Sequence, residues 1–233
     1  MCTVTFIPLG RDEFVLTSNR DVSSRRAPGS EPAIHVENGV RLLYPKDGKA
    51  GGTWIGSSRD NRLICLLNGG FVNHRRKQEY RKSRGLIVTE LLAAEDLDER
   101  LGSIDLDSIE PFTLVLVQWE DEMRLSEFVW DGNSKHLREL SIEPRIWSSS
   151  TLFDEDMRNT RKIWFESWKS EDELSPAGIL DFHKTAGEGN DQVGVVLRRD
   201  QVGTVSITQF VKRKKVSVTY QAIQGPQRDP KDP

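Results

Sequence analysis

The sequence predicts one layered α+β domain. Segments with the periodicity of strands alternate with segments of helical periodicity, in the order strands, helices, strands, helices and strands. The 233 residues are enough to bury a sizeable core, and they contain no internal repeat or linker-like stretch. We expect a single domain over residues 1–224. A polar, proline-rich tail over residues 225–233 is predicted to be disordered.

The chain begins with a predicted β-hairpin. Residues 3–7 are β-branched or aromatic, as strands prefer, and residues 14–18 resume this pattern. Between them, a proline, a glycine and three charged residues indicate a turn. The second strand of a hairpin ends level with the start of the first. The Asn-Arg-Asp run at residues 19–21 should therefore lie close to residue 2.

The remaining elements follow from hydrophobic periodicity. Residues 22–33 are polar, contain Pro and Gly, and are predicted to form a loop. Three helices are predicted, over residues 86–94, along the apolar stripe of Met157, Trp164 and Trp168, and from Ser175-Pro176 onward. Further strands are predicted over residues 40–44, 63–67, 112–119, 125–130, 193–197, 202–210 and 216–220.

Cys2 is the first candidate for chemistry. If Met1 is removed, the mature chain begins with a residue that carries both a thiol and a free α-amine. An α-amine has a pKa of about 8, and such an amine beside its own nucleophilic side chain can activate that nucleophile. A retained Met1 would acylate the amine and abolish this base. The alternative is a cysteine without a catalytic role.

Arg20 and Asp21 are the next candidates. A guanidinium beside a cysteine favours the thiolate, and a carboxylate there could hold the ammonium group or orient the base. The alternative is a surface Arg–Asp pair that closes a turn and contributes little stability.

Two glycine-rich segments carry further candidates. In residues 50–56, paired glycines permit close approach by a ligand or another strand. Trp54 in this segment is either a pocket wall or an aromatic core anchor. After the apolar run at 63–67, the side-chain amide of Asn68 and backbone N–H groups around Gly69 could form an oxyanion hole. The alternative is a simple Asn-Gly turn.

Together these motifs resemble the transport-and-Golgi-organisation-two family, whose hallmark is an Asn-Arg-Asp-Glu run. The resemblance rests on Met1-Cys2-Thr3, the hairpin, Ser18-Asn19-Arg20-Asp21, and the segments at 50–56 and 62–69. That family is similar to N-terminal-nucleophile hydrolases of the bile-salt hydrolase and penicillin V acylase type. The resemblance therefore implies a four-layer αββα sandwich. It also implies a catalytic set of Cys2, Arg20, Asp21 and Asn68, and a substrate-binding set of Asn19, Trp54 and Gly69.

The chain departs from the family pattern at two positions. Val22 occupies the place of the glutamate that completes the hallmark run, so that carboxylate is missing here. Val205 stands where the family has an arginine after Gly-Thr, so a second guanidinium in the site would have to come from elsewhere.

Composition restricts the partners. A formal net charge of −3 gives no global attraction to nucleic acid or to an anionic membrane. The basic stretch at residues 74–84 could bind a phosphate or a substrate carboxylate. A solvated loop leading into a helix is the more common reading, and the stretch lacks the aromatic interleaving typical of RNA binding.

Neither a secretory signal nor a membrane-spanning run is visible. We therefore expect a cytoplasmic protein, with Golgi or mitochondrial association left open. Two cysteines do not make a disulfide framework, and Cys65, within an apolar run, is predicted to be a small buried hydrophobe.

The sequence predicts no metal site and no required cofactor. Its four histidines (His35, His74, His136 and His183) show no paired ligand spacing. Motifs for covalent haem and for a phosphate-binding loop are missing from the sequence. The family resemblance implies links to haem trafficking and to lipid or acyl-CoA homeostasis, which leaves haem as a candidate transported ligand.

The leading hypothesis is a cysteine hydrolase, amidase- or acylase-like, that acts on an amide-type, non-peptide C–N bond of a small molecule. The alternative is a non-catalytic trafficking factor for haem, lipid or acyl-CoA that is involved in Golgi organisation and secretion. The hydrolase predicts product, whereas the carrier predicts saturable binding without product.

Overall fold

The computed structural model describes residues 3–23, 26, 29–58, 61–171 and 174–223. Contacts divide the chain into two units. Unit 1 comprises Met1–Ala27, Pro144–Ser148 and Phe153–Pro233, and unit 2 comprises Pro28–Glu143 and Ser149–Leu152. Within the described residues, each unit holds one antiparallel sheet and two helices. The single domain over residues 1–224 stays a prediction, and both Cys2 and the tail at 225–233 lie outside the described residues.

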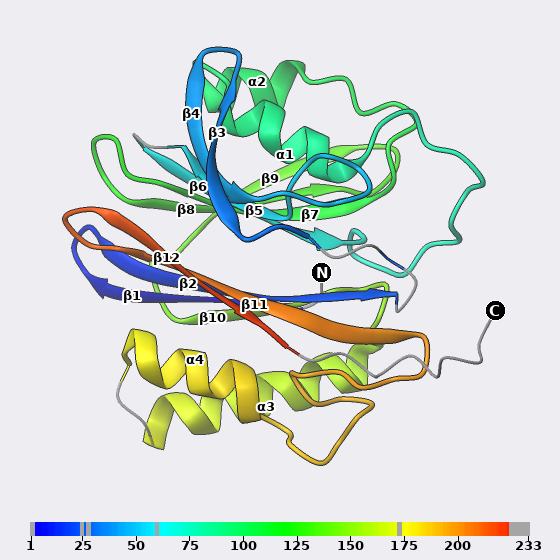
Figure 1. Cartoon of the computed structure of the whole chain (residues 1–233), viewed down its shortest axis with the longest axis vertical. Coiled ribbons are helices and arrows are strands. Elements are labelled where there is room, and N and C mark those ends of the chain that lie inside the picture. Colours follow the sequence, from blue (N-terminus) through cyan, green and yellow to red (C-terminus); the bar gives the residue numbers. More distant parts are fainter. Residues whose placement is uncertain (1–2, 24–25, 27–28, 59–60, 172–173, 224–233) are drawn as a thin grey trace. The chain divides into compact units, whose positions relative to one another are not determined.

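The sheet of unit 1 confirms the opening hairpin (Figure 1). Its strand order is β10 (Arg145–Ser148), β1 (Thr3–Gly10), β2 (Glu13–Ser23), β11 (Val202–Lys212) and β12 (Val216–Ala222). The turn is tighter than predicted, because Gly10 pairs with Glu13 after a register shift that begins at Pro8. β2 also continues beyond residue 18, so the Asn-Arg-Asp run is part of the ladder rather than of a turn.

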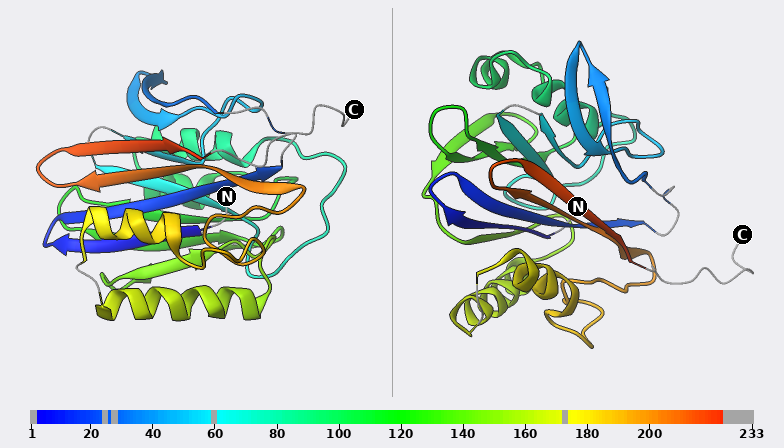
Figure 2. Two further views of the ribbon diagram at one scale, coloured as in Figure 1. Left: turned by 60° about the horizontal axis from the view of Figure 1, so that its bottom comes forward. Right: turned by 60° about the vertical axis from the view of Figure 1, so that its left-hand side comes forward.

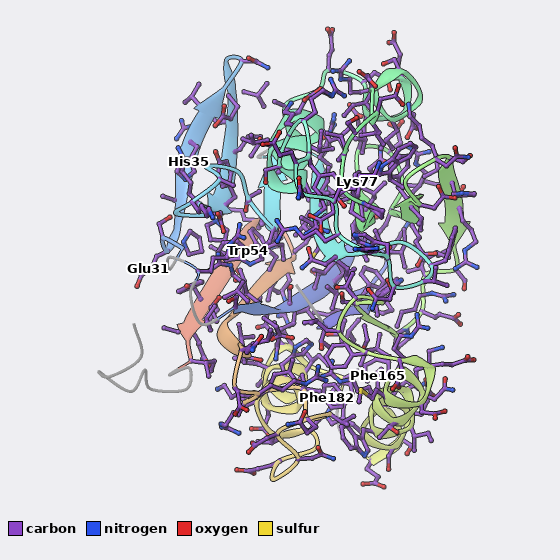
Figure 3. The ribbon with its side chains drawn as sticks, turned by 90° about the vertical axis from the view of Figure 1, so that its right-hand side faces the viewer. Glu31, His35, Trp54, Lys77, Phe165 and Phe182 are labelled. Carbon is purple, nitrogen blue, oxygen red and sulfur yellow. The ribbon has the colours of Figure 1, made fainter. Side chains whose placement is uncertain are left out.

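Helices α3 (Glu155–Glu171) and α4 (Pro176–Thr185) pack on one face of this sheet (Figure 2). The start of α4 is confirmed, since the hydroxyl of Ser175 accepts a hydrogen bond from the Gly178 N–H at 3.1 Å. The shared core consists of Ile7, Val15, Phe165, Ile179, Phe182 and Val195, with Trp164 and Trp168 partly buried against it. Figure 3 shows Phe165 and Phe182 at this contact. The predicted stripe on α3 therefore faces the core through Trp164 and Trp168, and the fully buried positions of the helix are Arg161 and Phe165.

The strand predicted over residues 193–197 was wrong. The segment is irregular, although Val195 and Leu197 are buried. Its first three carbonyl groups accept from side chains instead of from a ladder: Arg161 donates to the carbonyls of Val193 and Gly194, and Asn19 donates to that of Val195. Apolar composition alone does not reveal such partners.

The sheet of unit 2 contains the remaining strands. Its order is β3 (Pro32–Glu37), β4 (Val40–Pro45), β5 (Ile55–Ser58), β6 (Arg62–Asn68), β7 (Phe112–Gln118), β8 (Arg124–Trp130) and β9 (Lys135–Leu140). The strands predicted at 40–44, 63–67, 112–119 and 125–130 are confirmed. Sequence reasoning missed β3, β5, β9 and β10. Three of these lie at sheet edges, where a strand buries little and its alternation is weak.

Helices α1 (Arg84–Leu92) and α2 (Leu97–Ser103) belong to unit 2. The predicted helix over residues 86–94 is therefore confirmed, whereas α2 was missed. Arg62 on β6 donates to the carbonyls of Leu91, Ala94 and Glu95, which caps the end of α1. Among the described residues, no helix has the length and apolar character needed to cross a membrane.

The glycine pair after Ala50 permits the close approach that its composition predicted, and the approaching partner is the start of α1. The Thr53 N–H donates to the Gly85 carbonyl at 3.1 Å. A Cβ atom on Gly52 would lie 2.2 Å from the carbonyl carbon of Gly85 and 2.4 Å from the nitrogen of Leu86. Backbone therefore occupies the space of any side chain at this position.

We expect Gly52→Ala to lower the free energy of unfolding by at least about 2 kcal/mol, since α1 would have to shift away from the sheet. Gly102→Ala is the matched control, because a Cβ atom there meets nothing within 4 Å. Gly102 lies in α2, so alanine should leave stability unchanged or raise it by about 0.5–1 kcal/mol. The midpoints of urea unfolding measure the stability of both variants. Equal midpoints for Gly52→Ala and Gly102→Ala would contradict the close approach of backbone at Gly52.

Candidate functional site

The Asn-Arg-Asp run lies at the middle of the unit 1 sheet. On β2, Asn19 pairs with Thr3 of β1, while Arg20 and Asp21 pair with Ser206 and Thr204 of β11. Arg20 and Asp21 are each only 2% exposed. Burying two charged groups is costly unless they are paired and hydrogen-bonded. The alternative of a solvent-exposed Arg–Asp pair is therefore wrong.

Asp21 is held by a threonine. The Thr204 hydroxyl donates to Asp21 Oδ1 at 2.5 Å and accepts from the Leu197 N–H at 2.9 Å. The ladder between β2 and β11 shifts register between Thr204 and Ser206. Val205, which replaces the arginine of the family pattern, occupies this irregularity. A β-bulge of this kind can redirect side chains near a site.

Asn19 connects the sheet to α4. Its Nδ2 group donates to the carbonyls of His183, at 3.1 Å, and Val195, at 2.8 Å. Both amide hydrogens are thus used, which leaves Oδ1 as an acceptor. His183 Nδ1 lies 2.6 Å from that oxygen, and His183 Nε2 lies 2.8 Å from the Thr5 hydroxyl. Nδ1 must therefore carry the proton, and Thr5 donates to Nε2.

The imidazole of His183 is kept neutral by this environment. Complete burial, and secondarily the positive charge of Arg161, lower the pKa of His183 from 6.5 to about 3. A neutral ring matches the hydrogen-bond pattern, in which one nitrogen donates and the other accepts. His183 is a structural link between α4 and the first two strands.

Arg161 is the second buried group that sequence reasoning missed. From α3 it donates to the Val193 carbonyl at 2.8 Å, to the Gly194 carbonyl at 2.5 Å and to the Thr3 hydroxyl at 2.6 Å. Its guanidinium also lies 3.6 Å from the centroid of the Phe153 ring. The available signal was an arginine within the apolar stripe of a predicted helix.

In unit 2, Asn68 ends β6 with its backbone anchored. Its carbonyl accepts from the Ser149 hydroxyl at 2.7 Å. The next residue, Gly69, has φ of +85° and donates its N–H to the Pro111 carbonyl at 3.0 Å. That N–H is therefore not available for an oxyanion. The half-buried side-chain amide of Asn68 has no hydrogen-bond partner within the described part of the chain, and it remains a candidate donor.

Gly69 is required by its surroundings. A Cβ atom there would lie 2.3 Å from the Ser150 hydroxyl, and the φ angle is one that other residues rarely adopt. Trp54 is only 3% exposed, and a Cβ atom on Gly29 would lie 2.7 Å from its ring (Figure 3). These contacts favour the interpretation of Trp54 as a core anchor rather than as a pocket wall.

The predicted site residues therefore divide between the units. Unit 1 brings together Asn19, Arg20 and Asp21, whereas Trp54, Asn68 and Gly69 belong to unit 2. Cys2 precedes Thr3 and lies outside the described residues. Over the described ranges, His, Cys, Asp and Glu form no group of three or more that could hold a metal ion.

Comparison with known proteins identifies relatives of the sequence and of the fold. The sequence matches the family described as Transport and Golgi organisation 2 over residues 1–177. No curated protein matches it. The structure is similar to a Caenorhabditis elegans N-acylethanolamine-hydrolyzing acid amidase orthologue, with a TM-score of 0.59 and 12% identity over 89% of this chain and 92% of that one.

Two structures of conjugated bile acid hydrolase from Clostridium perfringens are also similar. An Arg-to-Leu variant has a TM-score of 0.53 and 8% identity, and covers 99% of this chain and 100% of its own. A Cys-to-Ala variant has a TM-score of 0.51 and 9% identity over 97% of both chains. At such identities the likeness shows the fold alone. The predicted class, an α+β αββα sandwich of the N-terminal-nucleophile hydrolase type, is thereby confirmed.

The lowered pKa of His183 predicts a specific pH dependence of stability. Between about pH 6.5 and 3 the unfolded chain binds a proton that the folded chain excludes. Stability from this group is therefore complete above pH 6.5 and is lost as the pH falls, by up to about 1.4 kcal/mol per pH unit. Urea unfolding between pH 6 and pH 4 measures how the free energy of unfolding depends on pH. In His183→Gln we expect this free energy to change less steeply with pH than in the unmodified chain, by about this amount.

His136→Gln, at a side chain that is 45% exposed, controls for the loss of an imidazole. If His183→Gln does not fold, nitrogen NMR of the unmodified protein at pH 5 decides instead. A protonated His183 ring in the folded protein at that pH would contradict the assignment.

Proposed function

The chain belongs to the Transport and Golgi organisation 2 family, and on that premise we propose that it is a cysteine hydrolase of the N-terminal-nucleophile type. Its substrate is a small molecule with an amide-type, non-peptide C–N bond. Two structural neighbours, an acid amidase and a conjugated bile acid hydrolase, support this substrate class.

The observation that carries the proposal is the burial of Arg20 and Asp21 beside the start of β1. Thr3, the residue after Cys2, pairs with Asn19, the residue before Arg20. Successive residues of a strand point to opposite faces. Asn19 faces the helices through His183, so Arg20 projects from the other face. Because α3 and α4 cover the face of Asn19, we place the proposed reaction on the face of Arg20.

In the proposed reaction, the α-amine of Cys2 accepts the thiol proton and the thiolate attacks the amide carbonyl. The Asn68 amide donates a hydrogen bond to the oxyanion of the tetrahedral intermediate. The resulting ammonium group protonates the leaving nitrogen, the C–N bond breaks, and a thioester remains. Water then attacks the thioester while the amine accepts its proton, which releases a carboxylic acid and restores the thiol.

Arg20 prepares the nucleophile in this scheme, because its guanidinium favours the thiolate. Asp21 lies two residues after Asn19 and so shares its face of the strand. Fixed there by Thr204, it acts as a positioning residue for the run that carries Arg20. Asn19 acts as a positioning residue, because its amide is engaged by His183 and Val195.

The amine can act only after Met1 is removed, so intact mass from the native host should show its loss. Retention of Met1 with saturable binding and no product would instead support the carrier of haem, lipid or acyl-CoA.

We place the activity in the cytoplasm, with Golgi or mitochondrial association as the family name and resemblance suggest. No metal or other cofactor takes part in these steps.

Cys2→Ala should abolish turnover of a panel of acyl amides that includes N-acylethanolamines and conjugated bile acids, because the nucleophile is lost while the amine remains. The panel is assayed by release of the free acid. Cys65→Ala is the matched control. It removes the other thiol, which is buried on β6, and should cost stability but retain turnover. Equal activity of Cys2→Ala and the unmodified chain would refute the hydrolase proposal.

Asn68→Ala should lower kcat by about 100- to 1,000-fold with little change in KM, since an oxyanion donor acts mainly in the transition state. Asn73→Ala, in the exposed loop that follows, controls for the loss of an amide. If Asn68→Ala raises KM and leaves kcat unchanged, Asn68 binds substrate in its ground state and the oxyanion role is wrong.

A further inference from the structure

The loop between β6 and α1 serves no step of the proposed reaction. Residues 69–83 contain no helix or strand and form the long connection shown in Figure 1. Loops of this length without secondary structure are uncommon in compact proteins and usually have a function of their own. The loop contains the basic stretch noted in the sequence.

The loop begins with an exposed apolar pair. Phe71 is 51% exposed and Val72 is 72% exposed. The Phe71 ring packs against His136 of β9 in a T-shaped contact at a centroid distance of 5.0 Å, and half of the residue still faces solvent. Adjacent exposed apolar side chains are costly in water, which points to a surface that covers them.

Cations follow this pair after two intervening residues. Residues 71–84 contain six Lys or Arg and one Glu, a net charge of +5 in a chain whose net charge is −3. Within the described chain, neither Arg75 nor Lys77 has an ion pair, and both are exposed. Figure 3 shows Lys77 in this loop. Arg76 lies 3.8 Å from Glu110 but is still 77% exposed.

The remaining basic residues fasten the loop instead. Their ion pairs join Arg81 to Asp105, Lys82 to Glu90, and Arg84 to Glu110. The Arg81 N–H also donates to the Ser108 carbonyl at 2.9 Å. At the other end, the Ser150 hydroxyl donates to the Val72 carbonyl at 3.3 Å. The loop is thus anchored through the backbone of Val72 and through residues 81–84, and the exposed side chains of residues 71–77 are presented beside and between these anchors.

We propose that residues 71–77 dock on an anionic lipid surface. Phe71 and Val72 enter the headgroup region, and Arg75 and Lys77 contact the lipid phosphates or carboxylates. Charge complementarity selects an anionic membrane, since the unpaired charges of the segment are positive. The apolar pair beside them favours lipid over RNA, because Val72 offers no ring on which a base can stack.

The test is sedimentation of the full chain with vesicles. The unmodified chain should bind vesicles of phosphatidylcholine mixed with phosphatidylserine, should not bind phosphatidylcholine alone, and should be released by high salt. Arg75→Gln with Lys77→Gln should weaken binding about 25-fold, at about fivefold for each charge. Phe71→Ser with Val72→Ser should weaken it at least about tenfold. Thermal unfolding confirms that each variant folds.

Two double variants are matched controls. Lys214→Gln with Lys215→Gln removes two exposed charges from the turn before β12, and Ile34→Ser with Val36→Ser removes two exposed apolar side chains from β3. Both should bind as the unmodified chain does. Equal losses in controls and loop variants, equal binding to neutral vesicles, or displacement by polyuridylate would overturn the proposal. No turnover is measured, so the outcome is independent of the hydrolase proposal.

Discussion

The burial of a polar run in the central strand of unit 1 is the constraint on which much of that unit depends. Asn19, Arg20 and Asp21 lie where a sheet normally carries apolar residues, and each polar group left without a partner there would cost about 1–3 kcal/mol. The partners come from distant segments. Thr204 approaches from β11, His183 from α4, and the Val195 carbonyl from the irregular segment before β11. Arg161 then satisfies the two carbonyls that precede Val195.

This constraint explains where sequence reasoning about the fold succeeded and failed. Strands with strong apolar character, such as β6 and β7, were predicted because their own residues determine their burial. Residues 193–197 have equal apolar character, yet they form no strand, because side chains more than thirty residues away take their carbonyl groups. The edge strands failed for the opposite reason. β9 is mostly exposed and charged, and its pairing with β8 defines it more than its composition does.

The candidate site shows the same division between local and distant information. A hairpin register can be derived from nearby residues, and it correctly placed the Asn-Arg-Asp run beside the start of β1. His183 is 164 residues from Asn19, and Arg161 is 158 residues from Thr3. Neither belongs to a short motif. The isolated histidine gave no signal, and the place of Arg161 within an apolar helical stripe did not identify its distant partners. The use of the Gly69 N–H by Pro111 was equally invisible, since it depends on how β7 begins.

Strand alternation gives the hallmark run two separate purposes. Asn19 and its paired residue Thr3 face the helices, where their hydrogen bonds fasten α3 and α4 to the sheet. Arg20 points to the opposite face and is therefore released from that task. Asp21 does not depend on a carboxylate at position 22, because the Thr204 hydroxyl donates to it and is itself fixed by the Leu197 N–H. Val22 pairs with Gly203, directly before that threonine. The run can thus lose its final glutamate and still hold Asp21 in place, because support for Asp21 comes from β11 rather than from its own strand.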